Sequence, residues 1–371
     1  MMVKSRSAKL FLLILLLVGL PLLGVALAGK PLAQYWEFPP LTRYVEHPDF
    51  SWPVFLVLAM LVGAITGPFI ARIIIPPKPA ISSSVELHPF PWWGYLGIGA
   101  LAIAWVLAWT RFPWFQPLQP FTFSPLWFGY IILINALIFM RTGHCMMLDR
   151  PAYFLALFPL SAVFWWYFEY LNRFVQNWYY MGISEFSPVE YALYATLPFS
   201  TVLPAVLGTK EWLESFTRLT APLRNLWPLQ IRHPSRFSWF ALLLGGAGLS
   251  GLGVWPDYMF AFLWIAPLLV MIAFQVRFDR KTPFSDVQHG DWRSIWLPAL
   301  AGLICGLLWE LWNSQSLAHW EYRVPYAHRF SIFEMPLLGY AGYLPFGLEC
   351  SVIADLFMGT RTGYVSQPLK K

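Results

Sequence analysis

Long apolar stretches separated by short polar connections dominate the pattern along this chain. Ten of them are long enough, or nearly so, to cross a hydrocarbon core about 30 Å thick as helices. They cover residues 10–28, 52–75, 93–110, 125–141, 152–171, 188–208, 237–254, 257–276, 294–313 and 334–358. The pattern predicts an all-α polytopic membrane protein with about ten transmembrane helices.

The composition agrees with this prediction. Of the 371 residues, 58% are hydrophobic and only 12% are charged, and the mean hydropathy is +0.54. A soluble domain is about 25% charged. The 21 tryptophans fit the aromatic belts that line both membrane surfaces.

The net charge of +6 reflects topology and does not indicate a nucleic-acid partner. If the N-terminus is cytoplasmic, 19 of the 25 Lys and Arg residues lie on the inner side. These are Lys4, Arg6, Lys9, Arg72, Lys78, Arg141, Arg150, Lys210, Arg218, Arg224, Arg232, Arg236, Arg277, Arg280, Lys281, Arg293, Arg361, Lys370 and Lys371. The positive-inside rule then predicts a cell-membrane protein with both termini cytoplasmic and with membrane lipids as partners.

The first apolar stretch has some features of a signal peptide. A basic start precedes it, and Ala26-Leu27-Ala28 before Gly29 is a small-residue cleavage pattern. The stretch is longer than most signals, which favours an uncleaved helix. Cleavage would leave the predicted orientation of the other nine helices unchanged.

A rare combination of polar residues occurs twice inside apolar stretches. Glu169 and Asn172 are followed by Trp178, and Glu310 and Asn313 are followed by Trp320. The two glutamates are 141 residues apart, as are the two asparagines, and the tryptophans are 142 apart. Leu197-Pro198-Phe199 likewise matches Leu344-Pro345-Phe346.

These matches predict two parallel four-helix repeats after two N-terminal helices. Residues 1–92 form the N-terminal pair, 93–208 the first repeat, and 237–371 the second. An even number of helices gives both repeats the same orientation. Between them, residues 209–236 place Trp212, Phe216, Leu219 and Leu223 at helical spacing among basic residues, which indicates an amphipathic helix on the inner face or else a plain solvated linker.

The Glu–Asn pairs are the leading candidates for chemistry. A spacing of three residues puts both side chains on one helix face. Burial near the outer edge of the membrane favours the protonated form of a carboxyl group, and the neighbouring amide can hydrogen-bond it. A protonated carboxyl group suits a general acid. The alternative is that both pairs are structural and hold helices together.

Three further acids join the candidate site. Glu190 and Glu334 stand at the start of the sixth and tenth stretches, where the helix dipole alone would also favour a carboxylate. Glu349 lies fifteen residues after Glu334, about 22 Å deeper in the membrane. Intramembrane ionisable residues are functional candidates by default.

Other patterns carry no chemistry. His319, Glu321, His328 and Glu334 match no metal-ligand spacing, so no metal is predicted. Gly246-Ala-Gly248-Leu-Ser-Gly251 fits the dinucleotide fingerprint but lies in an apolar stretch with no preceding strand. The glycines instead predict close helix packing, and no cofactor is expected. The three cysteines form no disulfide framework.

The segments from Glu169 through Trp178 to Pro188-Val-Glu190, and from Glu310 through Trp320 to Glu334, resemble the membrane carotenoid (lycopene) cyclase domains. In that family an acid, a downstream tryptophan and a Pro-x-Glu motif recur in tandem helical units. The resemblance implies acid chemistry on a long isoprenoid within the bilayer, with a membrane glutamate protonating a double bond.

The sequence therefore favours an enzyme acting on a lipidic substrate of isoprenoid type by glutamate acid–base chemistry, with Glu310 or Glu349 as the proton donor. The alternative is a carrier, or an assembly subunit of a membrane complex that has no catalytic role. Because the first repeat has no deep acid, we expect the second repeat to carry the function.

Overall fold

The structure is a computed structural model that describes residues 6–40, 42–75, 86–183 and 185–359. The α-helices are α1 (Arg6–Leu27), α2 (Trp52–Ile74), α3 (Trp92–Trp109), α4 (Phe123–Thr142), α5 (Met146–Asp149), α6 (Pro151–Val175), α7 (Pro188–Phe199), α8 (Val202–Glu214), α9 (Thr217–Thr220), α10 (Pro234–Val254), α11 (Pro256–Met259), α12 (Ala266–Arg277), α13 (Arg293–Asn313) and α14 (Tyr343–Met358). The 3-10 helices are η1 (Ala33–Tyr35), η2 (Pro113–Thr122), η3 (Ala221–Leu223), η4 (Phe260–Leu263), η5 (Val287–His289) and η6 (Leu337–Gly342). The strands are β1 (Trp178–Met181), β2 (His319–Tyr322), β3 (Ser331–Ile332) and β4 (Met335–Pro336).

The prediction of an all-α polytopic membrane protein is confirmed. In the described part of the chain, nine helical segments are long and apolar enough to cross a membrane. A tenth is the bent pair of residues 256–263 and 266–277, whose two parts meet at 49°. Helices satisfy their own backbone hydrogen bonds, which a hydrocarbon environment requires. Of the predicted basic residues, Lys4, Lys78, Arg361, Lys370 and Lys371 lie outside the described residues.

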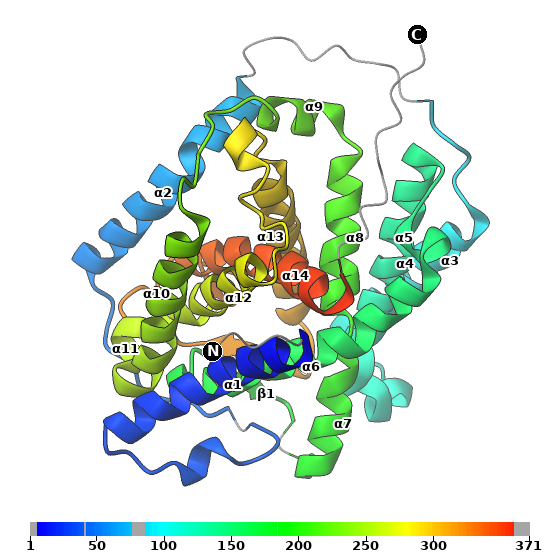
Figure 1. Ribbon diagram of the computed structural model, residues 1–371. Coiled ribbons are helices and arrows are strands. Elements are labelled where there is room, and N and C mark those ends of the chain that lie inside the picture. The colour runs from blue at the N-terminus through cyan, green and yellow to red at the C-terminus, as the bar shows by residue number, and fades with distance from the viewer. Residues whose placement is uncertain (1–5, 41, 76–85, 184, 360–371) are drawn as a thin grey trace.

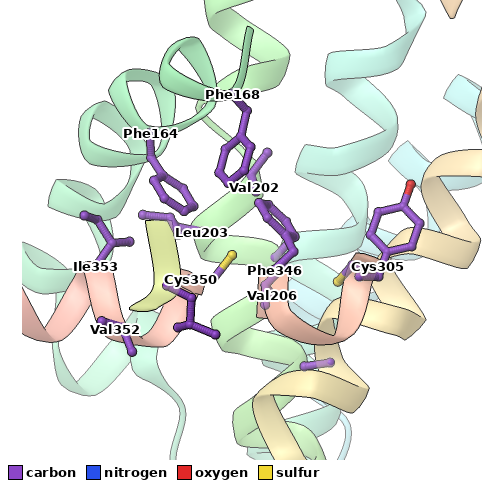
Figure 2. Close-up of a cluster of buried hydrophobic side chains, with 14 of the residues drawn as sticks. Phe164, Phe168, Val202, Leu203, Val206, Cys305, Phe346, Cys350, Val352 and Ile353 are labelled. Carbon is purple, nitrogen blue, oxygen red and sulfur yellow. The ribbon is translucent and has the colours of Figure 1, made fainter. Parts of the chain in front are cut away.

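Helices α13 and α14 occupy the centre of the molecule, with α3 and α4 on one side and α10 and α12 on the other (Figure 1). The core between α6, α8, α13 and α14 is built from interlocking aromatic and branched side chains. Phe164 and Phe168 of α6 pack on Phe346 of α14, and Val202 and Leu203 of α8 belong to the same cluster (Figure 2). This core fixes α14 against the two helices that carry the Glu–Asn pairs.

Small residues allow close helix contacts, as the glycine pattern predicted. A Cβ atom at Gly248 of α10 would lie 2.4 Å from the Phe262 ring, and one at Gly24 of α1 would lie 1.9 Å from the Ser250 carbonyl oxygen. A larger residue would displace the Phe262 ring at the first contact and the backbone at the second. The glycine-rich stretch of α10 is therefore a packing surface.

The connection between the proposed repeats differs from the single amphipathic helix expected for residues 209–236. Helix α8 continues to Glu214, and only the short α9 and η3 follow it. Pro222 and Pro228 interrupt any longer helix because proline donates no backbone hydrogen bond. Leu223 is fully buried, and the segment folds back on the loop before α13, where the Trp292 amide donates to the Leu223 carbonyl oxygen.

The last transmembrane helix also begins later than predicted. Residues Ser331–Ile332 and Met335–Pro336 form a hairpin, so Glu334 lies in a two-residue turn rather than in the first turn of a helix. Phe333, the other turn residue, has a positive φ of 54°. The chain then passes through η6 before α14 starts at Tyr343.

Candidate functional site

Two short strands bring the Glu–Asn segments together. Helix α6 carries Glu169 and leads into β1, and helix α13 carries Glu310 and leads into β2. The strands pair antiparallel, with Trp178 opposite Tyr322 and Tyr180 opposite Trp320. Tyr179 and Glu321, which lie 142 positions apart in sequence, face each other between these two pairs.

The two asparagines anchor these strands in the same way. The Asn172 Nδ2 donates to the Trp178 carbonyl oxygen at 2.7 Å, and the Asn313 Nδ2 donates to the Trp320 carbonyl oxygen at 2.7 Å. Each Oδ1 accepts a backbone amide, from Asn177 at 2.8 Å and from Trp320 at 2.8 Å. Both asparagines are fully buried. The prediction that each amide bonds its neighbouring carboxyl group was wrong, because the unpaired backbone after the helix end takes both amide atoms.

Glu169 accepts three hydrogen bonds on one oxygen. Its Oε1 receives the indole N–H of Trp165 at 3.0 Å, the indole N–H of Trp178 at 3.2 Å and the hydroxyl of Tyr180 at 2.6 Å. The side chain is fully buried. Strand β1, which follows α6, thus supplies two of the three donors.

Glu310 accepts tyrosine hydroxyls in the corresponding place. Its Oε1 receives Tyr322 at 2.7 Å and Tyr343 at 2.6 Å. The Trp320 indole lies beside this group and donates to the Tyr322 hydroxyl at 2.7 Å. Glu310 is also fully buried.

One glycine explains the difference between the two carboxyl environments. Trp165 stands four residues before Glu169, whereas Gly306 stands four residues before Glu310. A Cβ atom at Gly306 would lie 2.3 Å from the Tyr343 ring. The absence of a side chain there makes room for Tyr343 to enter from α14 and to take the place that Trp165 has beside Glu169.

The second oxygen of each glutamate is free of hydrogen bonds. Within the described residues, neither the Glu169 Oε2 nor the Glu310 Oε2 has a hydrogen-bond partner. Burial first, and then the neighbouring glutamate, raises the pKa of Tyr180 and of Tyr322 well above the usual tyrosine value. Both tyrosines are therefore neutral hydroxyl donors at physiological pH.

All the donors to the two glutamates line a single cavity of about 80 Å³. Its lining is almost wholly aromatic or aliphatic. The lining residues are Phe123, Trp165, Trp178, Tyr180, Ile183, Tyr191, Tyr194, Ala195, Pro198, Phe199, Val202, Trp264, Trp309, Ala318, His319, Trp320, Tyr322, Met335 and Tyr343. Glu169 and Glu310 lie behind this wall, so a ligand in the cavity meets the tyrosines and tryptophans first.

Three other predicted acids lie outside this arrangement. Glu190 is exposed and caps α7, where its carboxylate accepts the Ser187 amide at 2.8 Å. Glu334 is half-buried in the β3–β4 turn. Neither Glu190 nor Glu334 therefore joins the buried carboxyl group of its own repeat, because one sits in a helix cap and the other in a hairpin turn.

Glu349 is buried apart from the cavity. It follows Tyr343 by six residues, which is about 9 Å along the helix and on another face. In the described part of the molecule, neither carboxyl oxygen has a hydrogen-bond partner, and the Leu268 backbone lies beside the group without hydrogen-bonding geometry. Phe346, which contacts cavity residues Trp165 and Trp309, lies between Tyr343 and Glu349 along α14.

The tyrosines are the site residues that the sequence interpretation missed. Tyr180 and Tyr322 each stand two residues after the tryptophan that was singled out, so the pattern Glu-x-x-Asn followed by Trp-x-Tyr occurs twice. That recurrence was a usable signal. Trp165, four residues before Glu169 on the same helix, was a further usable signal, whereas Tyr343 had none because its role depends on Gly306 and on the packing of α14.

Among the described residues, no group of three or more His, Cys, Asp and Glu side chains could hold a metal ion. No family model matches the chain, and no curated protein or solved structure is significantly similar to it. The fold and the site together define the class: an all-α integral membrane protein with two buried carboxyl groups behind one aromatic cavity.

Proposed function

We propose that this protein is a membrane-embedded enzyme that acts on an unsaturated lipidic substrate, of isoprenoid type, by proton transfer in the aromatic cavity. The observation that carries the proposal is that every hydrogen-bond donor to Glu169 and Glu310 lines that one cavity. A proton held on a buried carboxyl group can thus reach a ligand through a single tyrosine.

Tyr343 is the residue that delivers the proton in this proposal. Its hydroxyl proton passes to a double-bond carbon while the protonated Glu310 carboxyl group replaces it. The π electrons form the new C–H bond and leave a cation, which the surrounding rings stabilise. The Glu310 carboxylate then recovers a proton from a neighbouring carbon through Tyr343 or Tyr322. No oxidant or reductant is needed, so the reaction class is isomerisation by migration of a double bond.

The size of the cavity limits what enters it. Its volume of about 80 Å³ is smaller than the cavity of about 150 Å³ that holds a benzene molecule. One end of a long substrate therefore occupies the site, and the remaining chain stays in the lipid. A long isoprenoid fits this arrangement because its apolar chain partitions into the bilayer.

The proposal includes the organisation inferred from the sequence. Both termini are cytoplasmic, the cavity lies toward the outer side, and residues 93–208 and 237–371 are parallel repeats. The matching asparagine contacts and the β1–β2 register support the repeats, since each asparagine performs the same task at the same offset.

A carrier is the second candidate, and Glu349 favours it. A fully buried carboxyl group with no hydrogen-bond partner in the described residues is costly, and binding of a proton or a solute cation would offset that cost. A membrane-complex subunit without its own reaction is the remaining alternative.

Lipid extracts of a deletion strain, compared with wild type by mass spectrometry, test the proposal. An altered isoprenoid pool that a plasmid copy restores supports the enzyme. An unchanged lipid profile together with a transport defect contradicts the enzyme and supports the carrier. Complementation with Tyr343→Phe then asks whether the cavity is responsible, with Tyr194→Phe as the matched control. Tyr194 lines the same cavity, but its hydroxyl donates to the Pro120 carbonyl oxygen at 2.9 Å.

A further inference from the structure

A second cavity, of about 550 Å³, lies where α10 begins and α12 ends. This volume is within the range of about 300–1,000 Å³ that small-molecule sites occupy. Unlike the aromatic cavity, its wall mixes basic groups, hydroxyls and amides. The lining residues are Ile231, Pro234, Ser235, Phe237, Ser238, Val276, Arg277, Asp279, Arg280, Thr282, Phe284, Ser285 and Gln288.

Arg277 is the central group of this second cavity. Its guanidinium stacks 4.1 Å from the centre of the Trp239 ring. The Nε and Nη2 atoms are buried, and within the described residues neither has a hydrogen-bond partner. Buried donors that belong to a charged group are costly when unpaired. The stacking presents a planar fork of donors that a phosphate or carboxylate matches.

The rest of the cavity wall is consistent with an anion. Arg280 lines it and also caps the end of α14, where it donates to the carbonyl oxygens of Asp355 and Leu356. The first turn of the 21-residue α10 contributes Ser235 and the partial positive charge of a helix N-terminus. Asp279 is the one acidic side chain among the lining residues, and it is exposed.

The surroundings point to a lipid. Trp239, Phe240 and Leu243 follow Ser235 along α10 and are 53%, 63% and 69% exposed. Large apolar side chains exposed on a membrane helix face acyl chains. Trp239 both stacks on Arg277 and faces outward, which is the position of an interfacial tryptophan.

We propose that this second cavity binds a phosphate group, carried by the headgroup of an anionic membrane lipid whose acyl chains lie along Trp239 and Leu243. Arg277 lines the cavity and supplies its guanidinium charge to the phosphate, Arg280 adds charge, and the start of α10 faces the same oxygens. This inference is independent of the reaction at the aromatic cavity.

Native mass spectrometry of the purified protein tests this, with phosphatidylglycerol titrated into the detergent solution. We expect Arg277→Gln to weaken binding at least about ten-fold, which corresponds to roughly 1.4 kcal/mol. Lys281→Gln is the matched control, since it removes the same charge from a side chain that is 68% exposed and does not line the cavity.

Ser235→Asp keeps the test decisive if Arg277→Gln fails to fold. An acid in the first turn of α10 favours the helix, yet it places a negative charge in the cavity. We expect it to leave the melting temperature unchanged or higher and to weaken phosphatidylglycerol binding as much as Arg277→Gln does. Equal binding by wild type and Ser235→Asp would overturn the proposal, as would equal losses in Arg277→Gln and Lys281→Gln.

Inorganic phosphate separates the two sources of the ligand. If millimolar phosphate competes with phosphatidylglycerol for the wild-type protein but not for Arg277→Gln, the site is supported and its ligand is a free anion. Lipid binding that resists phosphate, but that is lost in Arg277→Gln, assigns it to the headgroup. If the wild-type protein binds neither phosphatidylglycerol nor phosphate, the proposal is wrong.

Discussion

Tyr179 lies directly opposite Glu321 in the β1–β2 ladder, and its hydroxyl donates to the Glu321 carboxylate. The two residues are 142 positions apart, the same offset that separates Trp178 from Trp320 and Tyr180 from Tyr322. The ladder is therefore centred on a pair of corresponding residues. Pairing at this point sets both glutamates behind one cavity instead of leaving each with a cavity of its own.

The first prediction concerns the asparagine anchors. Asn313→Ala removes both partners of the Trp320 backbone at a fully buried position. Each buried backbone group left unpaired costs about 1–3 kcal/mol, so the melting temperature in detergent should fall clearly. Asn172→Ala should lower the melting temperature in the same way. Asn225→Ala, at an exposed position, is the control. A fall no larger than the control's would refute the anchoring role.

A second prediction tests why Tyr343 reaches Glu310. In Gly306→Ala the new Cβ would overlap the Tyr343 ring, which must move away from the carboxyl group. Overpacking of this kind costs about 1–3 kcal/mol, and we expect it to reduce activity as Tyr343→Phe does. Gly99→Ala is the matched control in a membrane helix, because no atom lies within 4 Å of its Cβ position. Full activity in Gly306→Ala would show that the contact between Tyr343 and Glu310 is not required for activity.

The third prediction concerns the unequal glutamates. Glu310 contacts two tyrosine hydroxyls, whereas Glu169 contacts one hydroxyl and two indoles. Indole N–H groups do not pass protons on, so Glu310→Gln should lower product formation by about 10²–10⁴-fold. Glu169→Gln should keep measurable activity. Product is measured in cells, with the melting temperature of each purified variant as the folding control. Equal losses in both variants would mean that the two segments contribute equally.

The fourth prediction is that replacing Glu349 raises the free energy of unfolding but lowers activity. Because neither of its buried oxygens has a hydrogen-bond partner in the described residues, Glu349→Leu should raise the free energy of unfolding by about 1–3 kcal/mol. Glu310→Leu should lower it, since two tyrosine hydroxyls lose their acceptor. Thermal melts of both variants decide this. From the sequence we also expect Glu349→Gln to abolish activity, and normal activity there would limit Glu349 to a structural role.

The fifth prediction tests the orientation with introduced cysteines. The native thiols are all buried, and burial raises the pKa of Cys145 to about 11, so none should react readily at neutral pH. A membrane-impermeant maleimide should label Glu185→Cys in intact cells, and Gln230→Cys only after lysis. Both positions are exposed. The reverse labelling pattern would invert the proposed topology and place the aromatic cavity toward the cytoplasm.

The sequence by itself determined the class of fold and the positions of the membrane helices. Hydropathy is sufficient for this because any backbone in hydrocarbon must bond to itself within a helix. It also identified Glu169 and Glu310, since a carboxyl group within an apolar stretch is costly and therefore rare. For residues 209–236 the apolar spacing favoured an amphipathic helix over a solvated linker, and Pro222 and Pro228 within that segment prevent a single helix.

The partners of those carboxyl groups were decided by tertiary structure. Tyr322 reaches Glu310 from the same segment, but Tyr343 arrives from another helix through the space left by Gly306. Likewise, the rotation of α14 directs Tyr343 to the cavity and turns Glu349 away from it. Local sequence fixes which residues share a helix, whereas long-range packing fixes which face meets which neighbour. The amide of Asn313 could have bonded the adjacent carboxyl group, and it bonds Trp320 because the strand pairing holds that backbone within reach.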